Sequence, residues 1–149
     1  MAYKRFLAMV ATSTVVMFGH MYTTVYTLDH VWFSQTKLWM ALYMGGTMAI
    51  IMLSFMWSMY GDKRKNVAIY AGSAVLIAGS LFVVRDQTTV EDVAWMKALI
   101  PHHSTAILTS ERADISDPRV RVLADEIIQT QREEIAEMER LIADLEAGE

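Results

Sequence analysis

The sequence contains no cysteine and only two prolines among its 149 residues. The lack of cysteine excludes disulfides, zinc–thiolate sites and cysteine nucleophiles, and it leaves no redox marker of the compartment. Acidic residues are scarce in the first part of the chain. Residues 1–84 hold two acidic residues and six Lys or Arg, a net charge of +4. Residues 85–149 hold fifteen acidic residues and seven Lys or Arg, a net charge of −8. The charge pattern predicts a boundary near residue 85, and the acidic second part argues against a nucleic-acid partner.

Three long stretches of the first part carry no acidic or basic side chain apart from His20. They cover residues 6–28, 38–60 and 67–84. A helix of about 20 apolar residues crosses a lipid bilayer. We therefore predict that residues 1–85 form a membrane domain of three transmembrane helices.

The cations that flank these stretches predict the orientation. Lys4 and Arg5 precede the first stretch, and three cations at 63–65 separate the second from the third, whereas the loop 29–37 carries one cation, Lys37. Loops rich in Lys and Arg stay in the cytoplasm. The N-terminus is then cytoplasmic, and residues 86–149 are periplasmic or extracellular, on the outer side of an inner or plasma membrane.

Methionine is abundant in the second stretch, where it recurs at residues 40, 44, 48, 52, 56 and 59. A spacing of four drifts by about 40° per step around a helix, so these side chains form a winding band. The band is interpreted either as packing or as a path of soft ligands for Cu(I). Met17, His20 and Met21 of the first stretch form a candidate membrane site on the second interpretation. A hydrogen-bonded packing role for His20 remains the alternative.

The acidic part predicts two helices. Thr88-Thr89-Val90-Glu91 fits a capping box, which places one helix at about 89–114. Asp117-Pro118 is a typical start for a second helix at about 117–146. The short link between them predicts an antiparallel hairpin. The fold class is therefore all-α: three transmembrane helices, followed by an extracytoplasmic two-helix hairpin over residues 86–149.

Each predicted helix of the hairpin has an apolar stripe with one polar residue in its middle, His103 on the first helix and Gln131 on the second. Two helices cannot bury such stripes alone. We expect self-association into a homo-oligomer, most simply two hairpins forming a four-helix bundle. The alternatives are that the membrane surface or the first outer loop covers this face.

The hairpin resembles the domain-of-unknown-function 305 family over roughly residues 89–146. The resemblance is carried by Trp95-Met96-Lys97-Ala98-Leu99-Ile100-Pro101-His102-His103, and later by Asp117-Pro118-Arg119-Val120-Arg121 and by Gln131, Glu134-Ile135 and Met138. The family often has Met where this chain has Leu99 and Thr109.

This resemblance implies a ferritin-like four-helix arrangement, and several members of the family are periplasmic copper-binding proteins. It implies copper-ion ligation here by Met96, His102, His103 and Met138. Gln131 and Glu134 are candidates for supporting these ligands.

Two functions follow as hypotheses. The first is copper binding on the outer face, for sequestration or handover, because imidazole and thioether suit copper. The second is a non-catalytic assembly module in which the His, Gln and Met side chains pack the core. An enzyme is not expected, because the sequence lacks the Glu-x-x-His, His-Glu-x-x-His and P-loop patterns.

Overall fold

The computed structural model describes residues 2–87 and 89–148, which form helices and loops without strands. The all-α expectation is therefore confirmed for this part of the chain. Contacts divide the chain into two compact units, Met1–Met21 with Thr36–Thr89 and Tyr22–Gln35 with Val90–Glu149. The second unit thus differs from the hairpin predicted from charge alone, because it includes a segment that the sequence placed in the membrane domain.

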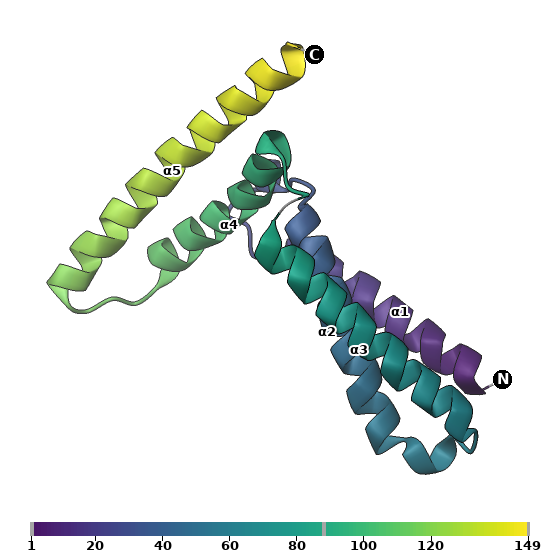
Figure 1. Ribbon diagram of the computed structural model, residues 1–149. Coiled ribbons are helices and arrows are strands. Elements are labelled where there is room, and N and C mark those ends of the chain that lie inside the picture. The colour runs from purple at the N-terminus through teal and green to yellow at the C-terminus, as the bar shows by residue number, and fades with distance from the viewer. Residues whose placement is uncertain (1, 88, 149) are drawn as a thin grey trace. The chain divides into compact units, whose positions relative to one another are not determined.

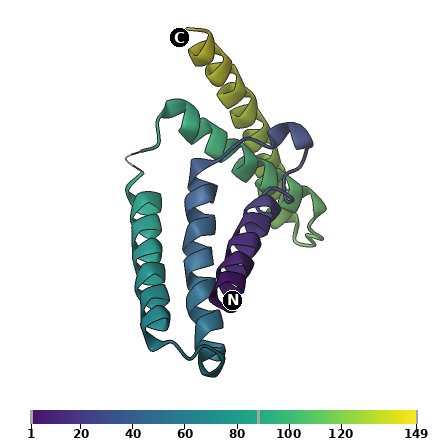
Figure 2. The ribbon, with the colours of Figure 1, turned by 90° about the vertical axis from the view of Figure 1, so that its right-hand side faces the viewer.

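The first unit consists of three helices that lie side by side (Figures 1 and 2). These are α1 (Ala2–His20), α2 (Gln35–Phe55) and α3 (Lys63–Asp86). At one end, Phe6 of α1 is buried with Ala49 and Leu53 of α2 and with Tyr60, which follows α2. This cluster fixes α1 along α2.

Two adjacent glycines bring α2 close to both of its neighbours. A Cβ atom at Gly45 would collide with the Thr14 hydroxyl of α1. A Cβ atom at Gly46 would lie 3.0 Å from Ile77 and 3.2 Å from the Ser73 carbonyl oxygen of α3. Small residues allow close approach of helices in membranes. Gly45-Gly46 is therefore the place where α2 packs most tightly against the other two helices.

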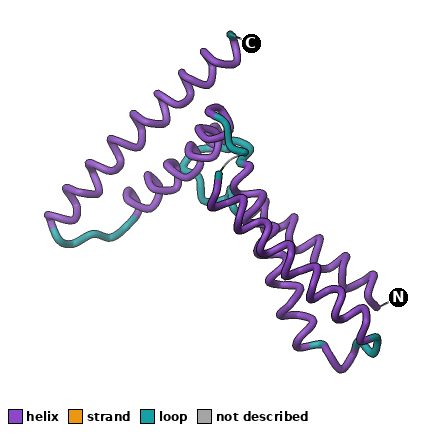
Figure 3. The backbone as a smooth tube through the Cα atoms, in the orientation of Figure 1, coloured by secondary structure: helices purple, strands orange, loops and turns teal. Residues whose placement is uncertain are grey.

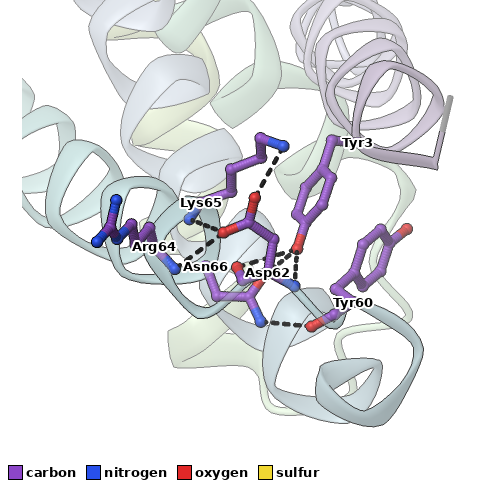
Figure 4. Close-up of polar contacts among 6 residues, drawn as sticks. All are labelled: Tyr3, Tyr60, Asp62, Arg64, Lys65 and Asn66. Carbon is purple, nitrogen blue, oxygen red and sulfur yellow. Dashed lines mark hydrogen bonds and ion pairs between the residues drawn. The ribbon is translucent and has the colours of Figure 1, made fainter.

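A polar cluster joins the start of α1 to the turn before α3 (Figure 4). The Tyr3 hydroxyl accepts from the Asp62 N–H at 3.2 Å and lies 2.8 Å from the Asn66 amide oxygen. Asn66 is fully buried and donates to the Tyr60 carbonyl at 2.9 Å. Asp62 caps α3 by accepting from the Arg64 and Lys65 N–H groups. Its hydrogen bond from the Lys65 side chain lowers the pKa of the Asp62 carboxyl group.

Among the described residues, α2 and α3 are the two helices long and apolar enough to cross a membrane. The expected span 6–28 is wrong in its extent, because α1 begins at Ala2 and ends at His20. Lys4 and Arg5 lie in its first turns, so the uncharged stretch of α1 is shorter than those of α2 and α3. Tyr22–Gln35 instead belong to the second unit. Tertiary contacts of this segment therefore override its apolar composition.

The second unit contains α4 (Asp92–Arg112) and α5 (Pro118–Ala147), which pack on each other. Their shared core consists of Met96, Ile100, Ile107, Ile135, Met138 and Ile142. The start expected near residue 89 differs from the structure, where Glu91 is the N-cap of α4 and makes no side-chain cap bond. Thr88 lies outside the described residues.

Asp117 begins α5 as its N-cap. Its carboxylate accepts from the Arg119 N–H, and Pro118 occupies the first helical position. The Arg119 side chain also donates to this carboxylate, which lowers the pKa of Asp117.

The close approach at Gly45 generates a prediction for the first unit. Gly45→Ala should lower the thermal stability of the purified protein in detergent, by about 1–3 kcal/mol, because the added methyl group overpacks the contact with Thr14. Gly72→Ala and Gly79→Ala are matched controls on α3, where an added Cβ meets nothing within 4 Å. Equal stability of all three variants would contradict a tight contact between α1 and α2.

Candidate metal site on the hairpin

His103 forms one of the polar contacts that join α4 to α5. Its Nε2 lies 2.8 Å from Oε2 of Glu134, and the two side chains are 14% and 50% exposed. The same carboxylate oxygen accepts from the Gln131 amide at 3.2 Å. Glu134 therefore faces the imidazole directly, and Gln131 orients the carboxylate.

The other imidazole nitrogen of His103 faces the backbone. Nδ1 lies 3.1 Å from the Leu99 carbonyl oxygen, which can only accept a hydrogen bond. A neutral ring with its proton on Nδ1 then presents the Nε2 lone pair to the carboxylate. Two such electron-rich atoms at 2.8 Å require a proton or a cation between them. Histidines that ligate metals commonly donate their second ring N–H to a carbonyl in this way.

The other three residues of the expected ligand set are not brought together with this pair. Met96 and Met138 are buried among isoleucines in the core of the hairpin. His102 is exposed, and its ring centroid lies 6.2 Å from that of His103. In the described part of the chain, no group of three or more His, Asp and Glu side chains is arranged to hold a metal. Of the expected four ligands, His103 is the one that contacts a carboxylate, that of Glu134.

Residues Tyr22–Gln35, which we call the cap segment, belong to the same compact unit as the hairpin and are largely loop (Figure 3). Ser104 of α4 is fully buried beneath it. The Ser104 hydroxyl accepts from the Tyr26 N–H at 2.6 Å and lies 2.8 Å from His30 Nδ1. Thr24 and Thr105 share a further hydrogen bond of 3.3 Å. These bonds fix the cap segment to the middle of α4.

Two aromatic side chains of the cap segment pack against the hairpin core, Tyr26 and Trp32. Each ring also faces a cation. Lys97 of α4 lies 5.4 Å from the centroid of the Trp32 ring, and the guanidinium of Arg132 on α5 lies 5.9 Å from that of Tyr26. The cap segment therefore contacts both helices, as a third layer of the domain.

Of the three membrane candidates, Met17 lines a cavity together with Met44, Met48 and Met52 of α2. His20 is the last residue of α1. Met21 follows it and donates its N–H to the Met17 carbonyl at 3.1 Å.

Sequence analysis gave the first outer loop as one possible cover of the hairpin, but it did not predict that Tyr26 and His30 would contact Ser104. Helical spacing places Ser104 about 80° from Met96, at the edge of the apolar stripe. A small polar residue at that edge was the available signal for a partner segment, but it did not identify which segment.

Comparisons with known proteins agree with the resemblance of the hairpin. The family model described as "Domain of unknown function (DUF305)" matches residues 84–147. An uncharacterized protein of Acanthamoeba polyphaga mimivirus is 31% identical over 106 residues, which cover 70% of this chain and 68% of the relative. That alignment is longer than the family match, so the similarity extends into the apolar helices. No solved structure matches the chain.

The buried Ser104 hydroxyl generates a prediction about the cap segment. Ser104→Ala should destabilise the second unit by about 1–3 kcal/mol, because it leaves the Tyr26 N–H without its partner. Hydrogen exchange of the backbone at residues 25–31 should accelerate, while exchange within α5 stays slow. Thr109→Ala is the control, since the Thr109 hydroxyl bonds to carbonyls of its own helix. Unchanged exchange in the Ser104 variant would contradict the anchoring role.

Proposed function

This chain belongs to the DUF305 family, and on that premise we propose that it is a membrane-anchored protein that binds a copper ion on an extracytoplasmic hairpin. The function would be sequestration of the ion or its handover to another protein. The observation that carries the proposal is the pairing of His103 Nε2 with the Glu134 carboxylate at 2.8 Å. A cation that displaced the proton between this imidazole and carboxylate would gain two ligands from two different helices.

The membrane anchor in this proposal has three crossings. Although α2 and α3 alone meet the criteria of length and composition, α1 packs along α2 from Phe6 to Thr14. A helix held in this way enters the bilayer with its partners. We therefore propose that α1 is the third transmembrane helix, with Lys4 and Arg5 at its cytoplasmic end.

The polar cluster around Tyr3 supports a single cytoplasmic end. Because Tyr3 bonds to Asp62 and Asn66, the start of α1 and the basic first turn of α3 lie at the same end of the unit (Figure 4). Both basic segments can then face the cytoplasm together, as the excess of cations in cytoplasmic loops requires. The hairpin follows α3 on the opposite side of the membrane.

The ligands assigned in this proposal are His103 and Glu134. His102 would be a further donor at the exposed side, whereas Met96 and Met138 would contribute only if the core of the hairpin rearranged. When bound, copper would neutralise the carboxylate that otherwise faces the imidazole nitrogen. The strongly acidic surface of the hairpin would also attract cations to it.

A second candidate function is assembly, and the surface of α5 favours it. Beside its buried stripe, α5 exposes a row of apolar side chains, namely Leu123, Ile127, Leu141 and Leu145. Helical spacing places all four within one narrow arc. This row would pack against a second copy to complete a four-helix bundle. His103 and Glu134 would then be a structural pair within the assembly.

The proposed orientation can be tested with single cysteines, because the chain has none of its own. Ala136→Cys on α5 should react with a membrane-impermeant maleimide added to intact cells. Lys63→Cys, at the start of α3, should react only after the membrane is opened. Both positions are exposed in the structure, so access to the reagent is not limited by folding. The reverse pattern of labelling would contradict the orientation.

The copper proposal predicts that the full-length protein in mild detergent competes with a chromogenic chelator for copper, tested separately as Cu(I) and Cu(II). His103→Ala should abolish binding at the hairpin, and Glu134→Gln should weaken it about 10-fold or more. Glu133→Gln is the matched control, because it removes a neighbouring carboxylate that bonds to Gln129 instead of His103. The control variant should bind as the unmodified protein does.

Two further variants separate the alternatives. His102→Ala and Met96→Leu/Met138→Leu report whether the remaining residues of the expected set contribute, and loss of Cu(I) binding in the methionine variant would show that the core opens. A defined oligomer that binds no copper, and that dissociates when Leu141→Lys is introduced, would overturn the copper proposal in favour of assembly.

A further inference from the structure

A group of soft donors lies within the first unit. A cavity of about 310 Å³ between α1 and α2 is lined by Met17, Tyr43, Met44, Thr47, Met48, Ile51 and Met52. Four of these seven side chains are thioethers, and two helices supply them.

The helical geometry of α2 explains why only part of its row of methionines lines this cavity. Met44, Met48 and Met52 are spaced four residues apart, so they turn by about 80° in total around the helix. Met17 of α1 faces the same arc from the neighbouring helix. Met40 lies one step before the arc and is not among the residues that line the cavity. The cavity therefore selects a compact set from a longer band.

The chemistry of the lining restricts the ligand. It contains no carboxylate and no imidazole, so it lacks the donors that hold Ca²⁺, Mg²⁺ or Zn²⁺. Thioethers are soft and neutral, and they select Cu(I) among the metals of the cell. Met17 lies in the last turn of α1, where the partial negative charge of the helix end favours a cation.

We propose that Met17 of α1, together with neighbouring methionines of the row Met44, Met48 and Met52 on α2, binds a soft monovalent cation, Cu(I), within the membrane unit. This site is separate from the His103–Glu134 pair, and it extends copper handling from the outer hairpin into the helices. A low charge and neutral ligands are what an apolar environment tolerates best. The same methionines would otherwise serve only as flexible packing.

Ag(I), a soft monovalent ion that does not change oxidation state, is the probe for this site. The full-length protein in detergent is titrated with Ag(I), and the number of bound ions and their affinities are measured by calorimetry. In the variant Met17→Leu/Met44→Leu/Met48→Leu, the affinity for one equivalent of Ag(I) should fall by about tenfold or more. Leucine has a similar volume, so the helices should remain packed. Met9→Leu/Met40→Leu/Met59→Leu removes as many thioethers outside the cavity and should change nothing.

The variant His102→Ala/His103→Ala tests the two proposed sites separately. It should still bind the one equivalent of Ag(I) that the methionines hold. X-ray absorption of this variant loaded with one Ag(I) should show sulfur neighbours, and this measurement does not depend on any methionine substitution. A shell of nitrogen and oxygen alone would overturn the proposal. Equal losses in the two methionine variants, or none in either, would also overturn it.

Discussion

The need to cover the apolar stripes of two antiparallel helices governs the second unit of this protein. The core between α4 and α5 consists of six buried side chains from the two helices. The cap segment meets this need on one side, through the rings of Tyr26 and Trp32 and through the buried hydroxyl of Ser104. This segment also connects α1 to α2 of the first unit. Folding of the hairpin is therefore coupled to the ordering of the loop between these two helices.

The coupling has a consequence for metal binding. Ser104 follows His103 directly, and the two side chains point to different partners. The cap segment is fixed to α4 through Ser104, while His103 remains turned to Glu134 of α5. The helix that presents the imidazole is therefore held from both sides. Such support fixes the orientation of a ligand before a metal arrives, which favours affinity.

Much of the fold could be predicted from the sequence, because the strongest local signals agree with the tertiary structure. The Asp117-Pro118 pair marks the start of α5 in the structure as it does in the sequence. The apolar runs of α2 and α3 are helices with little competition from other contacts. Residues 6–28 do not form the single helix that was predicted, because the second part of this stretch contacts α4. No local sequence pattern encodes such long-range contacts.

The candidate site was predicted less completely, for a related reason. Helical spacing placed His103 and Gln131 in the middle of facing stripes, but it could not show that Glu134 would turn toward the imidazole. Similarly, Met96 and Met138 were assigned by resemblance, and the structure uses both as core residues. Side-chain rotation at the edge of an interface depends on neighbours from both helices, so the periodicity of one helix does not determine it.

The central claim is that the outer hairpin holds copper at the contact between His103 and Glu134. Anomalous diffraction from crystals of the copper-loaded protein tests it most directly, because the metal is located without reference to any substitution. The account predicts a copper peak beside Nε2 of His103 and the carboxylate of Glu134. A hairpin without a peak there, in crystals that contain bound copper elsewhere, would contradict it.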